Sequence, residues 1–376
     1  MLSVLPTASA STETHVYPGQ SIQTAVNNAI AGDVITVHPG TYNEQVVISK
    51  ALTLQGFGEN TIIRPSQIKA NAFALFTRYG GGKTAAIVVA DASGSDVTIR
   101  NLKVDGDQIV ANGPVGSNLR QATGLVGVLY RDTAGTLNGL TVEDIGIKNG
   151  NDVLLTSLSP ASPLMTVEVK NCSISAYLKN GITASGPTVV AEISDNVVSG
   201  KGPVTYIAQN GIQVSYGSTG TVHGNKVDGN WYTGANWTSS GILIFESDEV
   251  SVQGNSISES QSGITVEAWG WMETSASNNK IVNNNITGAD WGVSVAAYAI
   301  PGSSASDPVA NNNKVINNSI SARSGDTGVY FGAYSYGGAF APTADNNKVI
   351  SNRIKGYTTP IADESTTGKV HANVSD

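Results

Sequence analysis

The chain has 376 residues, of which 42 are glycine, 13% are charged and 6% are aromatic, and its formal net charge is −8. The negative charge argues against a nucleic-acid partner, because nucleic acids are bound through clustered lysine and arginine. A single cysteine excludes an intrachain disulfide, and no segment is apolar and long enough to predict a membrane span.

The first ten residues resemble the end of a secretory signal peptide. They read M-L-S-V-L-P-T-A-S-A, and an apolar run that ends in A-S-A is typical of a cleavage site, here before Ser11. We therefore expect residues 1–10 to be a signal remnant and the protein to be secreted to the outside of a bacterial cell.

A short amphipathic segment follows, S-I-Q-T-A-V-N-N-A-I from Ser21 to Ile30. Ser21 is a suitable N-cap for a helix there. The strand-like segments V-I-T-V-H and Q-V-V-I-S come directly after it. A stack of strands exposes unpaired backbone groups at its end, so we expect residues 18–32 to cap that end.

An asparagine returns once per turn in the second half of the chain. The phrase is aliphatic, two polar residues, Asn, polar, aliphatic, as in V-H-G-N-K-V from Val222 to Val227. Its asparagines are spaced by 29 to 34 residues: Asn196, Asn225, Asn255, Asn284, Asn318 and Asn352. A repeat of this length predicts a stacked solenoid, in which the asparagines pass side-chain hydrogen bonds from turn to turn.

A second repeated segment runs in phase with the first. It is a glycine followed by Ile or Val, a variable residue and another apolar residue, as in G-I-Q-V, and it begins at Gly181, Gly211, Gly241, Gly263, Gly292 and Gly328. The period of two predicts a strand in which Ile212 and Val214 point inward and Gln213 and Ser215 point outward.

These repeats predict an all-β fold, a single parallel β-helix spanning residues 11–376. We expect coils from about residue 34 to 356 and a loose cover from 357 to 376, which is short of apolar residues. Upstream of the asparagines, Leu102, Ile145 and Cys172 occupy the equivalent position, so Cys172 is expected to be a buried hydrophobic residue.

Stacked turns bring basic and phenolic residues together near residues 177–210. Lys179 and Asn180 are expected beside Gln209 and Asn210, because they precede equivalent strands. Tyr177, Lys201 and Tyr206 lead into the same corner, and Arg131 is expected to join it from two turns earlier.

This set of side chains suits β-elimination on a uronic acid. That reaction needs a neutralised carboxylate, a base for the proton α to it, and an acid for the leaving oxygen. Lys179, Tyr206 and Lys201 are candidate catalytic residues, with the base and the acid left undecided. The candidate carboxylate-binding residues are Arg131, Gln209, Asn210 and Tyr177. Alternatively, the lysines are solvated surface residues and the asparagines belong to turn ladders.

Aromatic residues recur at one position of later turns. Trp269, Tyr298 and Tyr334 are candidate sugar-stacking residues; Trp271 and Tyr336 follow in the adjoining loops. The alternative is a satellite core covered by those loops.

Carboxylates and metal ligands offer a weaker pattern. Glu246 and Glu267 lie in adjacent turns, as a glycosidase pair would, but a solvated acidic patch has the same pattern. D-G-D-Q at Asp105 lacks the spacing of a calcium loop, and the four histidines form no zinc motif. We expect no metal and no cofactor.

The opening turns resemble those of the pectate-lyase-like superfamily of right-handed parallel β-helices. The resemblance spans roughly Val34 to Ile354 and includes I-T-V-H-P-G-T-Y-N-E-Q-V-V-I and L-T-L-Q-G-F-G-E-N-T-I-I. The motifs of polygalacturonases, calcium-dependent pectate lyases and pectin methylesterases are missing. This resemblance implies a right-handed coil shared by several activities.

The segments A-Y-L-K-N-G-I-T-A-S-G and Y-I-A-Q-N-G-I-Q-V-S are similar to secreted bacterial β-helix lyases, including alginate lyases of polysaccharide lyase family 31. That resemblance implies cleavage of mannuronate-rich alginate without a required metal. It favours the lysines and tyrosines of this segment.

The sequence thus predicts a secreted, monomeric polysaccharide lyase acting on an anionic polysaccharide, alginate first, with no nucleic-acid or membrane partner. A uronan C5-epimerase, a non-catalytic glycan-binding β-helix and a glycoside hydrolase using Glu246 and Glu267 remain alternatives.

Overall fold

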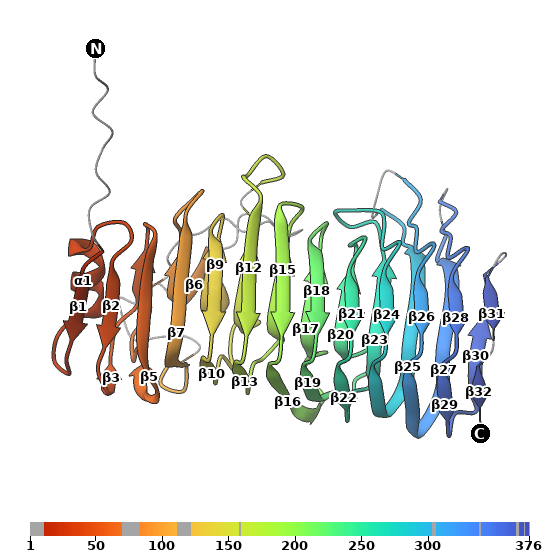
Figure 1. The fold of residues 1–376 in the computed structure, drawn as a ribbon. Helices are drawn as coiled ribbons and strands as arrows, with labels where there is room; N and C mark the ends of the chain where they lie inside the picture. Colours follow the sequence, from red (N-terminus) through yellow and green to blue (C-terminus); the bar gives the residue numbers. More distant parts are fainter. Residues whose placement is uncertain are drawn as a thin grey trace, which may run out of the picture.

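Parallel strands stack along one axis from the N-terminal to the C-terminal end of the molecule (Figure 1). The computed structural model describes residues 11–69, 83–110, 122–157, 159–302, 306–337, 340–365, 368–371 and 373–375. The chain visits three faces in each full turn, which we name A, B and C in the order of the chain. The expected all-β parallel β-helix is confirmed.

Each face is a column of parallel strands. Face A contains β1 (Glu13–Val16), β2 (Val34–Val37), β9 (Ala134–Asn138), β12 (Met165–Lys170), β15 (Val189–Ser194), β18 (Thr219–His223), β21 (Ser251–Gln253), β24 (Lys280–Val282), β26 (Lys314–Ile316), β28 (Lys348–Ile350) and β31 (Lys369–His371). Face B contains β3 (Gly40–Tyr42), β10 (Thr141–Glu143), β13 (Ser173–Ser175), β16 (Val197–Val204), β19 (Lys226–Tyr232), β22 (Ser256–Ser258), β29 (Arg353–Lys355) and β32 (Val374–Ser375). Face C contains β4 (Val46–Ile48), β6 (Lys83–Ala90), β8 (Ala122–Arg131), β11 (Asn151–Thr156), β14 (Asn180–Ser185), β17 (Asn210–Ser215), β20 (Ser240–Phe245), β23 (Ser262–Ala268) and β30 (Thr359–Asp363).

Four longer strands turn a corner and contribute to two faces. β5 (Leu52–Ile63) and β7 (Asp96–Asp105) run from face A to face B, and β25 (Asn285–Ala299) and β27 (Ser319–Ser335) run from face B to face C. At these four strands the parallel pairing continues from one face to the next.

Helix α1 (Ile22–Asn28) covers the first turn, as expected of the cap (Figure 1). Ser21 is its N-cap, and the Ser21 hydroxyl accepts a hydrogen bond from the Thr24 N–H. The Glu44 carboxylate accepts from the first N–H groups of the helix, Ile22 and Gln23. Ile22 and Val26 are buried, so the apolar side of α1 closes the open end of the core.

Aliphatic columns fill the interior. On face C, Ile182 pairs with Ile212, which pairs with Ile242 and then Ile264. All four are fully buried, and burying a side chain of this size stabilises a fold by about 1.5–3 kcal/mol. The period-two pattern of the sequence thus placed the inward residues correctly.

The repeated asparagines form a buried ladder at the corner between faces A and B. The Asn255 Oδ1 atom accepts from both the backbone N–H and the side-chain amide of Asn225, at 3.0 Å each. The Asn255 amide donates to the Val222 carbonyl and to Asn284 Oδ1. The same pattern joins Asn196, Asn225, Asn255, Asn284, Asn318 and Asn352, and it continues to Asn373.

A second asparagine ladder, which the sequence analysis missed, stands at the corner between faces C and A. Asn279, Asn313 and Asn347 are buried, and each accepts the backbone N–H of the equivalent residue one turn earlier. In the sequence this ladder is marked by the repeated segment N-N-K, whose lysine is the first residue of β24, β26 and β28.

The glycine at the second position of β14, β17, β20 and β23 is required by close packing. A Cβ atom on Gly211 would lie 2.4 Å from Val227 Cγ1 and 2.6 Å from the Gly241 carbonyl oxygen. Gly181, Gly241 and Gly263 meet the next turn in the same way. Only glycine lets the backbones of successive turns approach so closely.

The coil extends to Ser375, the last residue that the structure describes. β30, β31 and β32 add strands to faces C, A and B beyond residue 356, where the sequence led us to expect a loose cover. In the described part of the chain, no helix has the length and apolar character needed to cross a bilayer.

Asn255→Ala is expected to lower the free energy of unfolding by about 2–4 kcal/mol, because it leaves the buried Asn225 N–H without an acceptor. Urea unfolding would measure it. The matched control is Asn285→Ala on the exposed side of face B, with an expected change within about 0.5 kcal/mol. Equal effects of the two substitutions would contradict a stabilising role for the ladder.

Candidate active site on face C

The predicted lysine corner forms where face B turns into face C. It consists of the segments before β14 and β17. Asn180 pairs with Asn210 in parallel register, and the Asn210 N–H donates to the Lys179 carbonyl at 2.9 Å. Lys179 therefore lies directly beside Gln209, as the repeat spacing predicted.

Lys179 is the strongest acid–base candidate of this corner. Its Nζ atom donates to the Ala208 carbonyl at 2.5 Å, and no carboxylate of the described residues forms an ion pair with it. Burial disfavours the charged amine and lowers the pKa of Lys179 to about 8. At pH 7 about a tenth of this lysine is then an uncharged amine, far more than of a solvated lysine.

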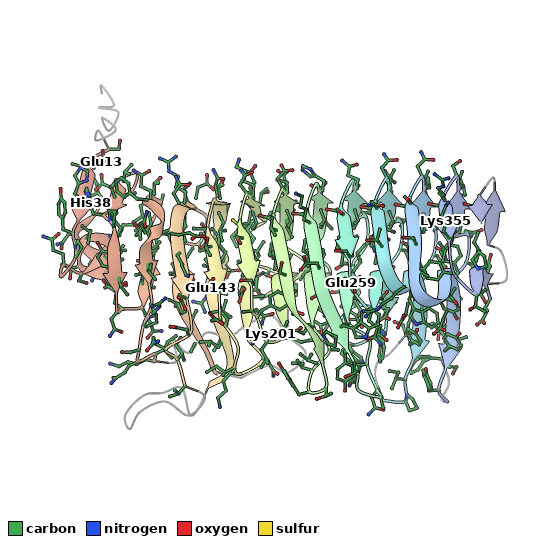
Figure 2. All side chains as sticks on the ribbon, turned by 90° about the horizontal axis from the view of Figure 1, so that it is seen from below. Glu13, His38, Glu143, Lys201, Glu259 and Lys355 are labelled. Carbon is green, nitrogen blue, oxygen red and sulfur yellow. The ribbon has the colours of Figure 1, made fainter. Side chains whose placement is uncertain are left out.

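Tyr206 and Lys201 lie on the outer side of the corner. Tyr206 is 62% exposed, and its hydroxyl makes no hydrogen bond to the described residues. The Lys201 side chain crosses the preceding turn, because a Cβ atom on Gly146 would lie 2.8 Å from its Nζ. Glu143 and Lys201 are both visible from below in Figure 2. A phenol and an ammonium group are therefore accessible at this corner.

Three of the predicted carboxylate-binding residues are buried and hold the corner together. The Gln209 amide donates to the carbonyls of Tyr177 and Leu178, and its oxygen accepts from the Lys201 N–H. The Tyr177 hydroxyl donates to Asn230 Oδ1 at 2.6 Å. The Asn210 amide donates to Asn180 Oδ1. The alternative that the asparagines belong to turn ladders fits Asn210 better than substrate binding does. Gln209 and Tyr177, for which the sequence suggested no such role, are likewise engaged in the interior of the corner.

Arg131 does not join the corner. It ends β8 and pairs with Thr156 of β11, whereas Lys179 precedes the first residue of β14, so the two lie at opposite edges of face C. The Arg131 guanidinium forms an ion pair with Asp91 at 2.5 Å. The expectation that it completes the cluster is corrected by the position of Arg131 along its strand.

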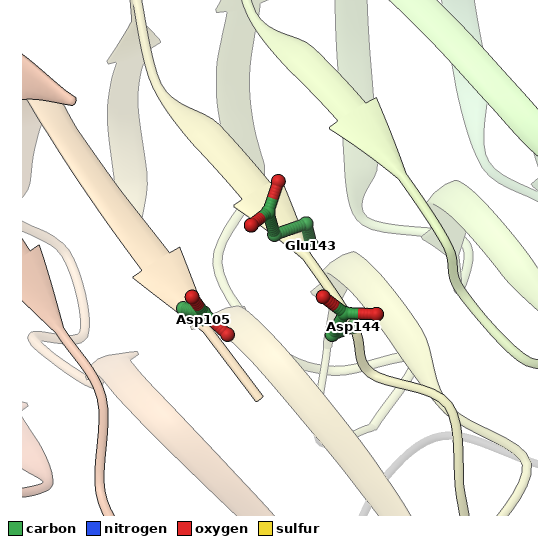
Figure 3. Close-up of side chains that lie close together, drawn as sticks. All are labelled: Asp105, Glu143 and Asp144. Atoms are coloured by element: carbon green, nitrogen blue, oxygen red, sulfur yellow. The ribbon is translucent and has the colours of Figure 1, made fainter. Parts of the chain in front are cut away.

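An acidic cluster stands beside the corner on face B. Asp105, Glu143 and Asp144 each present a carboxylate oxygen within 4.8 Å of the others (Figure 3). Arg64 pairs with Asp105, and Lys103 pairs with both Asp105 and Glu143. These cations already neutralise two of the carboxylates, so the cluster gives no reason to place a metal ion there.

Asp152 is an unusual residue that the sequence analysis did not single out. Its neighbours Asn151 and Val153 pair with Asn180 and Ile182, so Asp152 occupies the position that Gly181 has in the next turn. The carboxyl group is fully buried, and burial raises its pKa well above the usual range. In the sequence it could have been recognised as an aspartate at the repeat position where the following turns have glycine.

An aromatic wall covers the opposite edge of face C. The Trp269 ring stacks on Trp237 with centroids 5.7 Å apart and contacts Trp271 at 5.2 Å and Tyr298 at 5.0 Å. Tyr298 stacks on Tyr334 at 5.6 Å. We define the aromatic wall as Trp237, Phe245, Trp269, Trp271, Tyr298, Tyr334 and Tyr336. The structure thus brings the three predicted sugar-stacking residues together.

The wall remains partly open to solvent. Trp237 is 52% exposed, Tyr334 37% and Tyr336 66%. Trp237 comes from the loop before β20 and was missed, because that loop has no counterpart in the repeat. Exposed stacked rings of this kind suit the apolar faces of sugar rings.

Glu267 lies against the aromatic wall. The Trp269 indole N–H donates to its carboxylate at 2.9 Å. Burial disfavours the carboxylate and raises the pKa of Glu267 to about 7. A carboxyl group with this pKa can donate or accept a proton near neutral pH.

Glu246, the expected partner of Glu267, is occupied by backbone groups. Its carboxylate accepts the N–H groups of Trp271, Met272 and Glu273 at 2.5, 2.8 and 3.0 Å. The Glu246 side chain is fully buried. It therefore shapes the loop that carries Trp271, and the geometry does not favour it as half of a hydrolytic pair.

The lysine corner and the aromatic wall share face C but lie apart. Glu267 is six residues farther along the strand direction than Lys179 and three turns later. Standard strand geometry gives separations of about 20 Å along the strands and about 14 Å along the axis. The two clusters are therefore separate parts of one surface, and a polymer of several sugar units could contact both.

A family model described as "Right handed beta helix region" matches residues 126–354. The chain belongs to this right-handed β-helix family. A search of curated proteins finds no match. The matched region includes the lysine corner, the aromatic wall and both asparagine ladders.

Solved structures share the fold of this right-handed β-helix protein. The A-module of a mannuronan C-5 epimerase from Azotobacter vinelandii aligns with a TM-score of 0.55 at 15% identity, covering 93% of this chain and 94% of that one. A polygalacturonase from Erwinia carotovora ssp. carotovora aligns at 0.52 and 12%, covering 100% and 95%. A lacto-N-biosidase from Eubacterium ramulus aligns at 0.53 and 10%, covering 96% and 68%. At these identities the likeness concerns the fold.

The fluorescence of Trp269 is expected to titrate with a midpoint near pH 7, because Glu267 ionises beside its indole. The free energy of unfolding should fall as the pH rises from about 4.5 to 7, because over this range the carboxyl group of Glu267 keeps its proton in the folded protein but has lost it in the unfolded chain. Glu267→Gln should remove the fluorescence titration and lessen the fall in stability, whereas the exposed Glu192→Gln should do neither. A midpoint that persists in Glu267→Gln would contradict the assignment.

Proposed function

We propose that the protein is a carbohydrate-active enzyme that cleaves a uronic-acid polymer by β-elimination, with alginate as the first substrate to test. The observation that carries this proposal is Lys179 at an accessible corner of face C, a lysine with a pKa of about 8 and no carboxylate partner among the described residues. A base with such a pKa is matched to chemistry near neutral pH.

Each step of the elimination has a candidate residue. The uncharged Lys179 amine removes the proton at C5, and the electron pair forms the C4–C5 double bond. The C4–O4 bond breaks, and the Tyr206 hydroxyl donates a proton to O4. Lys201, whose ammonium lies at the same corner, offsets the charge of the substrate carboxylate. Arg131, which pairs with Asp91, and the buried residues Gln209, Asn210 and Tyr177 are not part of the proposed carboxylate-binding site.

The aromatic wall supplies subsites for the rest of the polymer. Trp269, Tyr298 and Tyr334 present stacked rings on the same face as Lys179, a few sugar units away. Binding energy from such remote subsites can position the reacting sugar.

The names of structural neighbours agree with a uronate substrate. A mannuronan C-5 epimerase, a periplasmic alginate epimerase and a polygalacturonase are among them. An epimerase would use the same base and neutraliser but return the proton to C5 without breaking the chain. The resemblance to polysaccharide lyase family 31 favours cleavage.

Acid–base chemistry at Glu267 is the second candidate. A pKa of about 7 and the surrounding aromatic rings favour it. No lysine or arginine of the described residues forms an ion pair with Glu267, so this carboxyl group would suit hydrolysis of an uncharged sugar. A glycan-binding role without turnover uses the same wall.

We also propose that the protein is secreted and monomeric. The signal-like residues 1–10 lie outside the described residues. We propose that the protein acts outside a bacterial cell on a soluble or matrix polysaccharide.

Mixing the protein with polymannuronate should produce the ultraviolet absorbance of an unsaturated uronate. Lys179→Ala and Tyr206→Phe should each lower this rate by about 10²–10⁴-fold, the contribution typical of an acid or base. Lys226→Ala, an exposed lysine on face B, is the control. Absence of absorbance with alginate, pectate and hyaluronan would rule out the lyase. Altered proton spectra at constant chain length would indicate the epimerase.

The pH profile provides a separate test of the base. The value of kcat/KM should rise with pH and level off above about 8, because the reactive form of Lys179 is the uncharged amine. Reducing ends without an unsaturated product, abolished by Glu267→Gln and retained in Lys179→Ala, would instead support hydrolysis at the aromatic wall.

A further inference from the structure

Four lysines are in register on face A, Lys280, Lys314, Lys348 and Lys369, and the structure describes the side chains of the first three. Lys280 pairs with Lys314, and Lys314 pairs with Lys348, in successive parallel strands. Neighbouring strands are about 4.8 Å apart, so these cations repeat at every turn. We call Lys280, Lys314 and Lys348 the lysine row.

The lysine row is rigidly placed. Each lysine directly follows a buried asparagine of the second ladder, Asn279, Asn313 or Asn347. The following residue of each strand, Ile281, Val315 or Val349, is fully buried in the core. The backbone of the row is thus held from both sides, and only the side chains are free to adjust.

The positive charge of the row is not neutralised within the described residues. None of the three ammonium groups takes part in an ion pair or a hydrogen bond there. Like charges directly opposite one another in neighbouring strands are destabilising. Ser251 occupies the same position one turn earlier, so the fold does not require lysine there.

A groove of about 730 Å³ runs along the row. The exposed residues Asn278 and Asn312 line it beside the lysines, and Glu249 lies at one end. On the other side of the row, Val282, Ile316 and Ile350 are half-buried and form an aliphatic strip. Cations, amides and a flat apolar strip therefore repeat together.

We propose that the lysine row is a binding surface for an anionic polysaccharide, distinct from the candidate active site on face C. Carboxylates that repeat along a sugar chain would pair with ammonium groups that repeat along the coil. The amides would bind hydroxyl groups, and the apolar strip would contact sugar rings.

The residues elsewhere on face A limit how far the binding surface extends and which ligands it can bind. In the same column of face A, Glu192 pairs with Thr221, and Glu168 lies one turn before Glu192, so a polyanion is repelled beyond Ser251. The net charge of −8 disfavours long nucleic acids and anionic membranes, which would extend over the acidic turns. The described residues of the row include no exposed large hydrophobic side chain that could insert into a bilayer.

This surface is independent of the reaction on face C. If the lyase proposal holds, the row would retain the polymer while its end is processed. If the lyase proposal fails, the row should still bind polyuronates. Binding measured in a Lys179→Ala background separates the two, because turnover is then removed.

The test compares two triple variants in that background. Lys280→Ser/Lys314→Ser/Lys348→Ser removes the row. The control Lys226→Ser/Arg353→Ser/Lys355→Ser removes the same charge from face B, where Ser256, Ser319 and Ser321 occupy the adjacent positions. Binding of polymannuronate and of polygalacturonate is measured by calorimetry in about 0.05 and 0.5 M salt, and unfolding midpoints verify folding.

The row variant should bind at least one of these polymers about tenfold more weakly at low salt, and the control should change by less than about threefold. High salt should remove most of the difference, since exposed charges are screened. Equal affinities of the two variants would overturn the proposal. Tighter binding of duplex DNA or phosphatidylglycerol vesicles than of either polyuronate would overturn the chosen occupant.

Discussion

The fold depends on stacking successive turns in register. Each turn is too thin to bury its own apolar residues, so its stability comes from the turn above and the turn below. Two buried asparagine ladders enforce the register, because each side-chain oxygen accepts an N–H group of the adjacent turn. A buried amide without its partner is costly, so a slip of one residue is strongly disfavoured.

Register turns a linear repeat into columns with distinct chemistry. On face C, one edge carries Lys179 with Tyr206 nearby, and the other carries Glu267 within the aromatic wall. On face A, the column changes from glutamate through threonine and serine to lysine along the axis. Several binding surfaces can therefore coexist on one rigid rod, each defined by residues about thirty apart in the sequence.

Burial divides the polar residues into two groups. Gln209, Asn210 and Tyr177 lie inside the corner, where their polar atoms join neighbouring segments. Lys179 is held half-buried by that framework, and its charge is disfavoured as a result. The buried residues are thus positioning residues, and the reactive group owes its lowered pKa to the corner that they build.

The sequence by itself determined the coil, its inward columns, the first asparagine ladder and the pairing of Lys179 with Gln209, since all of these follow from a period that the chain repeats. The second ladder was equally present, in N-N-K, but was not recognised. Tertiary structure alone decided that Arg131 lies at the far edge paired with Asp91, that Glu246 binds backbone, and that Trp237 joins the wall. The last two outcomes depend on the loops between strands, whose paths have no period, whereas Arg131 is placed by its position at the end of β8. Local spacing can specify which residues stack, but only the packed loops decide which of them remain exposed.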